Sequence, residues 1–370
     1  MIDKHILFLT LRVFSATGGI EKVCRVAGKA LHELSVESGC QPVKLFSLYD
    51  KTSDVNTLYF PAAIFTGFGK RRFNFLRAAF KEGIRSRMVI ISHVNLLLIG
   101  YLIKILSPKT KLVLIAHGIE VWRTLPRWKK RVLQKCDTIL PVSEFTKKKM
   151  MELYQIPEAK FNILNNCLDP FLAEPLQNKK DEHLLSRYGI GAADIVIMTL
   201  TRLASTERYK GYELVMQSVH DIKHRYPSIK YLIVGKYDAP EKARLDTIIK
   251  RLDLKEQIIF AGFIPDEELA QHYNLASLYI MPSQKEGFGI VFIEAMFYGK
   301  PVIAGNKDGS ADALQNGALG ILVNPESQQQ ITDAIVEVLN NTKKYIPLQA
   351  EVIKHFGFNV YKEKLRKIIG

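Results

Sequence analysis

The sequence is poor in cysteine, with four among 370 residues. They show neither C-x-x-C spacing nor a neighbouring histidine cluster, which speaks against a zinc site, and they are too few for a disulfide-held scaffold of this length. We therefore expect a reducing compartment and mostly small, buried cysteine side chains. The four are Cys24, Cys40, Cys136 and Cys167.

The chain also lacks a long, purely apolar run. The most lipid-like stretch, residues 88–106, is interrupted by His93, Asn95 and Lys104. Polar groups are costly in the hydrocarbon core, so this stretch predicts a buried strand followed by a packed helix, not a membrane span. The first apolar run, residues 6–9, has no small-residue cleavage site after it and predicts a first strand, not a signal peptide.

With 47% apolar and 24% charged residues, the composition gives no sign of disorder or low complexity. A length of 370 residues exceeds what one hydrophobic core usually organises, which favours two domains. Short apolar runs alternate with longer helical patterns, as in βαβ units with buried parallel strands. The runs are residues 6–9, 44–48, 89–92, 112–116, 138–142, 195–200, 231–234, 258–261, 278–281 and 301–304.

A polar stretch at residues 170–180 separates two series of such runs and is the candidate linker. The sequence thus predicts an α/β protein of two doubly wound, Rossmann-like domains that face a central cleft, at residues 1–175 and 176–355. In such sheets ligands bind beyond the carboxyl ends of the strands, so the loops there are the places to search.

Acidic residues are scarce in the first half. Residues 1–180 hold 29 Lys and Arg against 14 Asp and Glu, whereas residues 181–370 hold 23 of each, so the whole net charge of +15 lies in the first half. This asymmetry predicts an anionic partner such as a phospholipid surface, a pyrophosphate-bearing acceptor or nucleic acid. A basic face that merely aids solubility is the alternative.

Residues 70–87 predict a basic amphipathic helix, because Phe73, Leu76, Phe80 and Ile84 fall near helical spacing among many cations. Such a helix suits an anionic membrane interface, and residues 122–135, with both tryptophans, are a candidate extension. The basic segments lack nucleic-acid-binding signatures, so we expect no nucleic acid as partner. The cations are Lys70, Arg71, Arg72, Arg77, Lys81, Arg85 and Arg87.

Two phosphate-binding patterns, G-x-G-x-x-G and D-x-D, are absent. Instead, Gly18 and Gly19 precede a helical pattern, where backbone amides can approach an anion, although a plain tight turn explains them equally well. Arg202 follows a predicted strand, and Lys210 stands eight residues beyond it. Together these cations suit a diphosphate, against the alternative of two unrelated surface charges.

The strongest local signal is residues 283–295. Glu286 follows a predicted strand, Gly287 and Gly289 expose backbone amides, and Glu294 lies about two turns inside an apolar helix. A carboxylate buried in such a helix needs a partner, either a ribose diol or a salt bridge.

Together these segments resemble the retaining glycosyltransferases of family 4, which have the two-domain GT-B fold. The resemblance rests on the E-x7-E pattern from Glu286 to Glu294, on Arg202 with Lys210, and on the segments Gly18-Gly19-Ile20-Glu21 and His117-Gly118-Ile119-Glu120. The matching segments occur in order over nearly the whole chain.

The resemblance implies a hexosyltransferase that takes a UDP- or GDP-sugar as substrate and needs no cofactor and no metal. Arg202 and Lys210 would hold the diphosphate, Glu294 the ribose and Glu286 the transferred sugar. A helix at residues 356–370 would pack back on the first domain. The implied catalytic residues are His117, Arg202, Lys210 and Glu286. The implied donor-binding residues are Gly18, Gly19, Arg202, Lys210, Gly262, Phe263, Ile264, Glu286, Gly287, Phe288, Gly289, Ile290 and Glu294.

Two positions depart from the family pattern. Thr201 stands where many relatives have glycine before the arginine, and residues 306–312 keep only one of two adjacent glycines, which obscures donor specificity. No residue stands out as a nucleophile, so we expect a front-face reaction in which the leaving phosphate takes the acceptor proton.

The resemblance implies an acceptor that is a glycan or lipid-linked molecule of cell-surface polysaccharide or lipopolysaccharide biosynthesis. It also implies a cytoplasmic enzyme at the inner membrane face. The alternatives are another GT-B sugar enzyme, such as an epimerase or phosphorylase, or a non-catalytic protein that binds an anionic membrane or nucleic acid.

Overall fold

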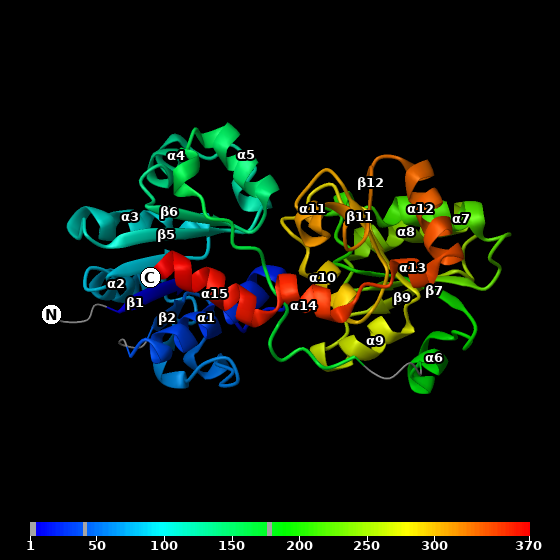
Figure 1. The fold of residues 1–370 in the computed structure, drawn as a ribbon, viewed down its shortest axis with the longest axis horizontal. Coiled ribbons are helices and arrows are strands. Elements are labelled where there is room, and N and C mark those ends of the chain that lie inside the picture. Colours follow the sequence, from blue (N-terminus) through cyan, green and yellow to red (C-terminus); the bar gives the residue numbers. More distant parts are fainter. Residues whose placement is uncertain (1–4, 40–42, 176–179) are drawn as a thin grey trace. The chain divides into compact units, whose positions relative to one another are not determined.

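The computed structural model describes residues 5–39, 43–175 and 180–370, which form two compact units (Figure 1). Unit 1 comprises Met1–Pro170 and Phe356–Gly370, and unit 2 comprises Phe171–His355. Each unit contains a six-stranded parallel sheet covered by helices on both faces.

The sheet of unit 1 has the order β3-β2-β1-β4-β5-β6, so the strand sequence reverses direction between β1 and β4. In register, Leu9 of β1 lies opposite Phe46 of β2 on one side and Ile91 of β4 on the other. The central strands are short and buried on both faces, which explains their continuous apolar runs. The strands are β1 (Ile6–Thr10), β2 (Lys44–Ser47), β3 (Phe65–Gly67), β4 (Met88–Ile91), β5 (Lys111–Ala116) and β6 (Thr138–Pro141).

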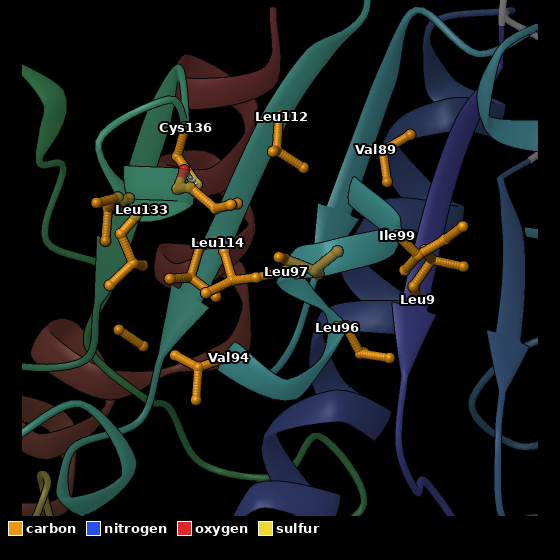
Figure 2. Close-up of a cluster of buried hydrophobic side chains, with 14 of the residues drawn as sticks. Leu9, Val89, Val94, Leu96, Leu97, Ile99, Leu112, Leu114, Leu133 and Cys136 are labelled. Atoms are coloured by element: carbon orange, nitrogen blue, oxygen red, sulfur yellow. Dashed lines mark hydrogen bonds between the residues drawn. The ribbon is translucent and has the colours of Figure 1, made fainter. Parts of the chain in front are cut away.

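Two hydrophobic layers cover this sheet. On one face, apolar side chains of α2 (Arg72–Gly83), α3 (Leu97–Leu106), α4 (Arg127–Leu133) and α5 (Glu144–Tyr154) pack on the strands. Figure 2 shows part of this layer, where Leu97 of α3 and Leu133 of α4 lie beside strand side chains such as Leu114. On the other face lie α1 (Gly19–Glu37) and α15 (Phe358–Ile369).

Helix α15 lies beside α1 although the two are far apart in the sequence (Figure 1). The Lys362 ammonium contacts the carboxylates of Glu33 and Glu37 at 2.9 and 2.8 Å. Beneath these ion pairs, Tyr361 and Leu365 are buried in the core of unit 1. The chain therefore returns to unit 1 at its C-terminal end.

Unit 2 repeats the same architecture with the strand order β12-β11-β10-β7-β8-β9. The strands are β7 (Ile195–Leu200), β8 (Ile229–Val234), β9 (Ile258–Gly262), β10 (Leu278–Met281), β11 (Val302–Gly305) and β12 (Ile321–Val323). The helices are α6 (Glu182–Tyr188), α7 (Tyr212–Ile222), α8 (Ala239–Arg251), α9 (Leu269–Leu275), α10 (Ile290–Phe297), α11 (Ser310–Ala313), α12 (Gln328–Asn340), α13 (Thr342–Tyr345) and α14 (Gln349–Phe356).

The α/β class and the two doubly wound sheets are confirmed, as are the ten predicted strands. Two further strands, β3 and β12, were missed. Each has three residues and lies at a sheet edge, so neither carries the apolar run by which a central strand is recognised.

The predicted basic helix is also present as α2, but its apolar residues are divided between two faces. Phe75 and Ala79 face the core, whereas Phe73 and Leu76 are exposed. Phe80 is partly packed on the core, so the residues expected to form one stripe do not all point the same way.

The lipid-like stretch forms β4 and α3, as predicted. In the described part of the chain, no helix has the length and apolar character needed to cross a bilayer. Cys24, Cys136 and Cys167 are buried free thiols, and burial raises the pKa of both Cys24 and Cys136 to about 12. Cys40 and residues 176–179 of the expected linker lie outside the described residues.

Candidate functional site

In unit 2 the strand order reverses between β7 and β10, whose following loops run in opposite directions across the sheet. Such a reversal opens a crevice at the carboxyl ends of the two strands, which is where ligands bind in open α/β sheets. Residues 201–211 follow β7, and residues 282–289 follow β10. These two loops carry three of the four charged residues predicted for the donor site in unit 2, namely Arg202, Lys210 and Glu286, whereas Glu294 lies inside α10.

Lys210 and Glu286 come together at this point. The Lys210 Nζ donates a hydrogen bond to Glu286 Oε2 at 2.5 Å, and their side chains are 14% and 19% exposed. Burial by itself favours the neutral amine, but the charge of Glu286 and the hydrogen bond to it outweigh burial and raise the pKa of Lys210. The lysine therefore remains a cation within a half-buried site.

Arg202 lies on the exposed side of the same loop. Its guanidinium contacts the Glu207 carboxylate at 2.6 Å while 73% of the arginine side chain is exposed. In the free protein, each of the two cations predicted to bind the diphosphate is thus paired with a neighbouring carboxylate. Arg202 also keeps N–H donors that are exposed to solvent.

The two loops interlock through their backbones. Gln284 N–H donates to the Tyr209 carbonyl at 2.9 Å. Gly211 has φ +81°, and a Cβ there would lie 2.3 Å from the Pro282 carbonyl oxygen. Glycine is required for this close approach, which fixes Lys210 relative to the loop that carries Glu286.

A third loop, after β11, binds the backbone of Glu286 through Asp308. The Asp308 carboxylate, on a residue that is 2% exposed, accepts the Glu286 N–H at 2.6 Å and the Ser310 N–H at 2.9 Å. Burial raises the pKa of Asp308 to about 7, and the charge of Glu286 adds to the shift against the opposing hydrogen bonds. Asp308 falls in the segment where one of the usual paired glycines is missing.

Glu286 also leads into α10. Gly289, with φ +89°, precedes the first helical residue, Ile290, and a Cβ on it would lie 2.2 Å from the Phe292 ring. The chain therefore turns sharply here, and the amides at the helix start face the carboxyl ends of the strands. Gly287 and Phe288, the other residues expected to bind the donor here, are buried.

Glu294 lies inside α10 and is 1% exposed. Its Oε2 accepts a hydrogen bond from the Tyr273 hydroxyl at 3.3 Å, and the Tyr273 ring stacks on Tyr298. Burial, together with the charge of Glu294, raises the pKa of Tyr273 far above its ordinary value, so the phenol remains a hydrogen-bond donor.

The loop after β9 shows a mixed arrangement. Phe263 is 49% exposed and has the Lys236 ammonium 4.6 Å from its ring centroid, whereas Ile264 is buried. Gly262, with φ +72°, accepts the Gly235 N–H at 2.7 Å. Of the three residues in this loop that the resemblance implies for donor binding, Phe263 is an exposed aromatic ring and Ile264 is buried.

In unit 1 the corresponding reversal lies between β1 and β4. The loop after β1 leads to Gly18 and Gly19 at the start of α1. The fully buried Asp50 holds this loop, since its carboxylate accepts the Val13 and Ser15 N–H groups at 2.7 Å each. The loop is thereby fixed before any ligand arrives.

His117 follows β5 in unit 1. Its Nε2 lies 2.9 Å from the Ser92 carbonyl oxygen and must donate to it, because a carbonyl cannot. Burial of the ring lowers the pKa of His117 to about 4. The Nδ1 atom is buried and has no hydrogen-bond partner among the described residues, so in this tautomer it is an unused acceptor.

The sequence did not point to three carboxylates that bind groups of the candidate site. They are Asp50, which binds the loop after β1, Glu207, which pairs with Arg202, and Asp308, which binds the Glu286 N–H. Glu207 stands between Arg202 and Lys210, and its proximity to two predicted ligands was a usable signal. The missing glycine marked the segment of Asp308 but gave no hint of its bonds. Nothing near Asp50 in the sequence points to its role, because the backbone N–H groups that it binds lie 35 to 37 residues away.

A separate hollow in unit 2 lies at the amino ends of β7, β10 and β11, near Ile195, Ser277 and Pro301. Lys300 lines it, and burial lowers the pKa of this lysine to about 8. Since it lies at the opposite ends of the strands, this hollow does not belong to the site described above.

Two family models match the chain. Residues 17–170 match the model described as "Glycosyltransferase Family 4", and residues 188–354 match "Glycosyl transferases group 1". The matches follow one another along the chain and together account for most of its length.

Curated relatives include two with stated donors or acceptors in their names. A GDP-mannose-dependent alpha-(1-6)-phosphatidylinositol monomannoside mannosyltransferase of Mycolicibacterium smegmatis is 27% identical over 63% of this chain and 62% of its own length. A D-inositol 3-phosphate glycosyltransferase of Corynebacterium urealyticum is 26% identical over 61% of this chain and 54% of its own length. The matching region thus spans less than two thirds of these relatives.

Solved structures share the fold over nearly the whole chain. Anabaena HepE in complex with UDP and glucose superposes with a TM-score of 0.81 at 18% identity, covering 99% of both chains. WaaG, a glycosyltransferase of lipopolysaccharide biosynthesis, gives a TM-score of 0.69 at 15% identity over 98% of this chain and 99% of its own. With its two six-stranded parallel sheets and these matches, the chain belongs to the family 4 glycosyltransferases of the GT-B fold.

Proposed function

We propose that this glycosyltransferase moves a hexose, with retention of its anomeric configuration, from a UDP- or GDP-sugar to a glycan or lipid-linked acceptor. The observation that carries the proposal is the contact of Lys210 with Glu286 at the strand reversal of unit 2, on loops that also carry the largely exposed Arg202. Two cations next to a carboxylate match a leaving diphosphate next to a sugar rich in hydroxyls.

Unit 2 binds the donor. The diphosphate takes the place of the two carboxylates that hold the cations in the free protein, with Arg202 offering a bidentate fork and Lys210 a point charge. The amides at the start of α10 add donors and the positive end of its dipole. Glu294 accepts hydrogen bonds from the ribose, and Phe263 lies against the nucleobase.

Unit 1 binds the acceptor and supplies His117. The unpaired Nδ1 of His117 accepts a hydrogen bond from a hydroxyl of the transferred sugar, which satisfies the buried atom. Its low pKa keeps the ring neutral at physiological pH, so Nδ1 stays available as an acceptor. The Gly19 amide at the start of α1 is a further donor for the diphosphate.

The reaction is electrostatic and positional. The bond from the anomeric carbon to the diphosphate oxygen breaks, and the acceptor oxygen forms its bond on the same face of the sugar. The acceptor proton passes to the departing phosphate oxygen, so no side chain is needed as nucleophile. Arg202 and Lys210 stabilise the charge that develops on the diphosphate.

The acceptor is assigned to cell-surface polysaccharide or lipopolysaccharide biosynthesis at the inner membrane face. Support comes from the names of the relatives, one of which acts on a phosphatidylinositol mannoside, and from WaaG and the galactosyltransferase WaaB among structures of the same fold. The net charge of +15 in residues 1–180 suits an acceptor that carries phosphate.

Product analysis tests the proposal. The protein is incubated with UDP- and GDP-hexoses and lipid-linked acceptors in the presence of EDTA, and the new linkage is assigned by NMR. We expect a glycosylated acceptor whose anomeric configuration equals that of the donor. An inverted product or a trapped glycosyl-enzyme would refute the front-face route. Epimerised donor formed without acceptor, or consumption of inorganic phosphate, would favour an epimerase or a phosphorylase.

A further inference from the structure

Three adjacent helices on one face of unit 1 expose apolar side chains. Helix α3 packs against both α2 and α4, and the core residues of all three face the same side of the sheet. The surface they present to solvent, here called the α2–α4 face, contains seven exposed large apolar residues. These are Phe73, Leu76, Leu98, Leu102, Ile105, Leu106 and Trp128.

Helix α3 is apolar on its outer side as well as on its inner side. Leu97, Ile99 and Ile103 are buried in the core. Leu98, Leu102 and Ile105, spaced four and three residues apart, form an outward stripe with exposed fractions of 50%, 43% and 52%. A surface helix normally keeps its outer side polar, so this stripe marks a binding surface.

Cations are concentrated in the segment of the chain that contains the stripe. Residues 70–135 contain 16 lysines and arginines but only two glutamates, so this segment carries a charge of +14, close to the +15 of the whole chain. Arg72, Arg77 and Lys81 of α2 form no ion pair with any acidic side chain in the described residues. The positive charge of these three α2 side chains is therefore not neutralised by a paired carboxylate.

We infer that the α2–α4 face docks the protein on an anionic phospholipid bilayer, with the apolar stripe inserted among the headgroups and the cations against lipid phosphates. Apolar side chains bounded by cations match the depth profile of such an interface. Nucleic acid would be met by cations alone and would leave the leucines in water. A second copy of the chain docked on the same face would bring together two segments that each carry a charge of +14, and these would repel each other.

This inference does not rest on the donor site, because every residue of the α2–α4 face lies outside it. A variant can therefore lose vesicle binding and keep sugar transfer, or lose sugar transfer and keep vesicle binding. Donor binding serves as the measure that a variant is folded.

Co-sedimentation tests the inference with vesicles of equal parts phosphatidylcholine and phosphatidylglycerol, against vesicles of phosphatidylcholine alone. One variant carries Arg72→Ser, Arg77→Ser and Lys81→Ser, and another carries Leu98→Ser, Leu102→Ser and Ile105→Ser. The control for the cation variant carries Lys250→Ser, Arg251→Ser and Lys255→Ser together. The control for the apolar variant carries Leu348→Ser and Ile353→Ser, and all five positions lie in unit 2.

We expect each variant of the α2–α4 face to weaken binding to the anionic vesicles about tenfold or more, and the controls to bind as the wild type does. Equal binding by all proteins would overturn the inference. So would a loss of self-association in the leucine variant without a loss of vesicle binding, or binding of duplex RNA in place of vesicles.

A second readout needs no variant of the apolar stripe. Trp128 is 44% exposed on α4, and Trp122, the other tryptophan, packs against Phe145. In a Trp122→Phe background, Trp128 fluorescence should shift to shorter wavelength when anionic vesicles are added. An unchanged spectrum with bound protein would show that α4 does not reach the bilayer and would contradict the proposed orientation.

Discussion

Among single residues, Asp308 has the least expected role. Its two carboxylate oxygens accept separate backbone N–H groups, of Glu286 and of Ser310, from a position that excludes water. Protonation removes one acceptor, because the protonated oxygen becomes a donor. The placement of the Glu286 loop therefore depends on the ionised form of a residue whose pKa lies at about 7.

This arrangement predicts an unusual pH dependence of stability. Between about pH 4 and pH 7 the unfolded chain loses the Asp308 proton while the folded protein retains it, so the folded state binds more protons and stability falls as pH rises. Asp308→Asn should remove this decline, which amounts to up to about 4 kcal/mol for a shift of three pKa units. Urea unfolding at pH 4.5 and pH 8 measures it. Parallel pH profiles for the two proteins would contradict the assignment.

The same residue should influence catalysis on the acid side. Protonated Asp308 holds only one of its two N–H partners, so turnover should fall below about pH 7 in the wild type. The groups that face it are Glu286 and, through Glu286, Lys210. In Asp308→Asn the rate should be low at every pH, with donor affinity less affected than turnover. An acid limb that persists in the variant would assign the titration to another group.

The charged residues of the donor site give a direct test by substitution. Arg202→Ala or Glu286→Ala should lower turnover at least about a hundredfold, because each removes a contact to the reacting part of the donor. Both proteins should stay folded, since Arg202 is largely exposed and Glu286 half-buried. Glu294→Ala should mainly weaken donor binding. Initial rates and donor titrations measure these effects, and unchanged turnover in the first two variants would refute the site.

At the scale of elements, the start of α10 depends on one glycine. Gly289 has φ +89°, and a Cβ would come within 2.2 Å of the Phe292 ring. Gly289→Ala should therefore lower the free energy of unfolding by about 1–3 kcal/mol and displace the amides at the helix start. Gly191→Ala, at an exposed turn without positive φ, is the matched control. Equal donor affinity in both variants would show that these amides do not bind the donor.

The helices and strands that could be predicted from the sequence are those with a strong local pattern of apolar residues. Buried parallel strands leave continuous apolar runs, so ten strands were found, whereas the edge strands β3 and β12 are too short to leave one. For α2 the helix was predicted, but Phe73, Leu76 and Phe80 could not be divided between core and solvent, because that depends on where α3 packs.

The candidate site was predictable to the extent that it lies beside strand ends. Arg202, Lys210 and Glu286 could be singled out because they follow β7 and β10, and the structure brings Lys210 and Glu286 together. Asp50 and Asp308 hold loops through backbone bonds between distant segments. Such bonds require the tertiary fold and leave no periodicity in the sequence.

At the scale of the whole molecule, the two units have sheets of the same topology but differ in charge. Both strand orders reverse beside the first strand of the unit, and both reversals are followed by loops with glycines and a helix start. Only unit 1 carries a net positive charge, and most of it lies in residues 70–135. We therefore propose that donor binding belongs to unit 2 and that unit 1 binds an anionic acceptor or surface.

We propose above all that unit 2 binds a nucleotide diphosphate through Arg202 and Lys210. Calorimetric titration of the wild type, Arg202→Ala and Arg187→Ala with UDP, GDP and ADP in EDTA tests it most directly. Arg187 is a matched control, because it is an exposed arginine paired with Glu268 away from the site. We expect UDP or GDP to bind the wild type and Arg187→Ala equally and to bind Arg202→Ala at least about tenfold more weakly. No binding by any of the three nucleotides, or equal binding by all three proteins, would contradict it.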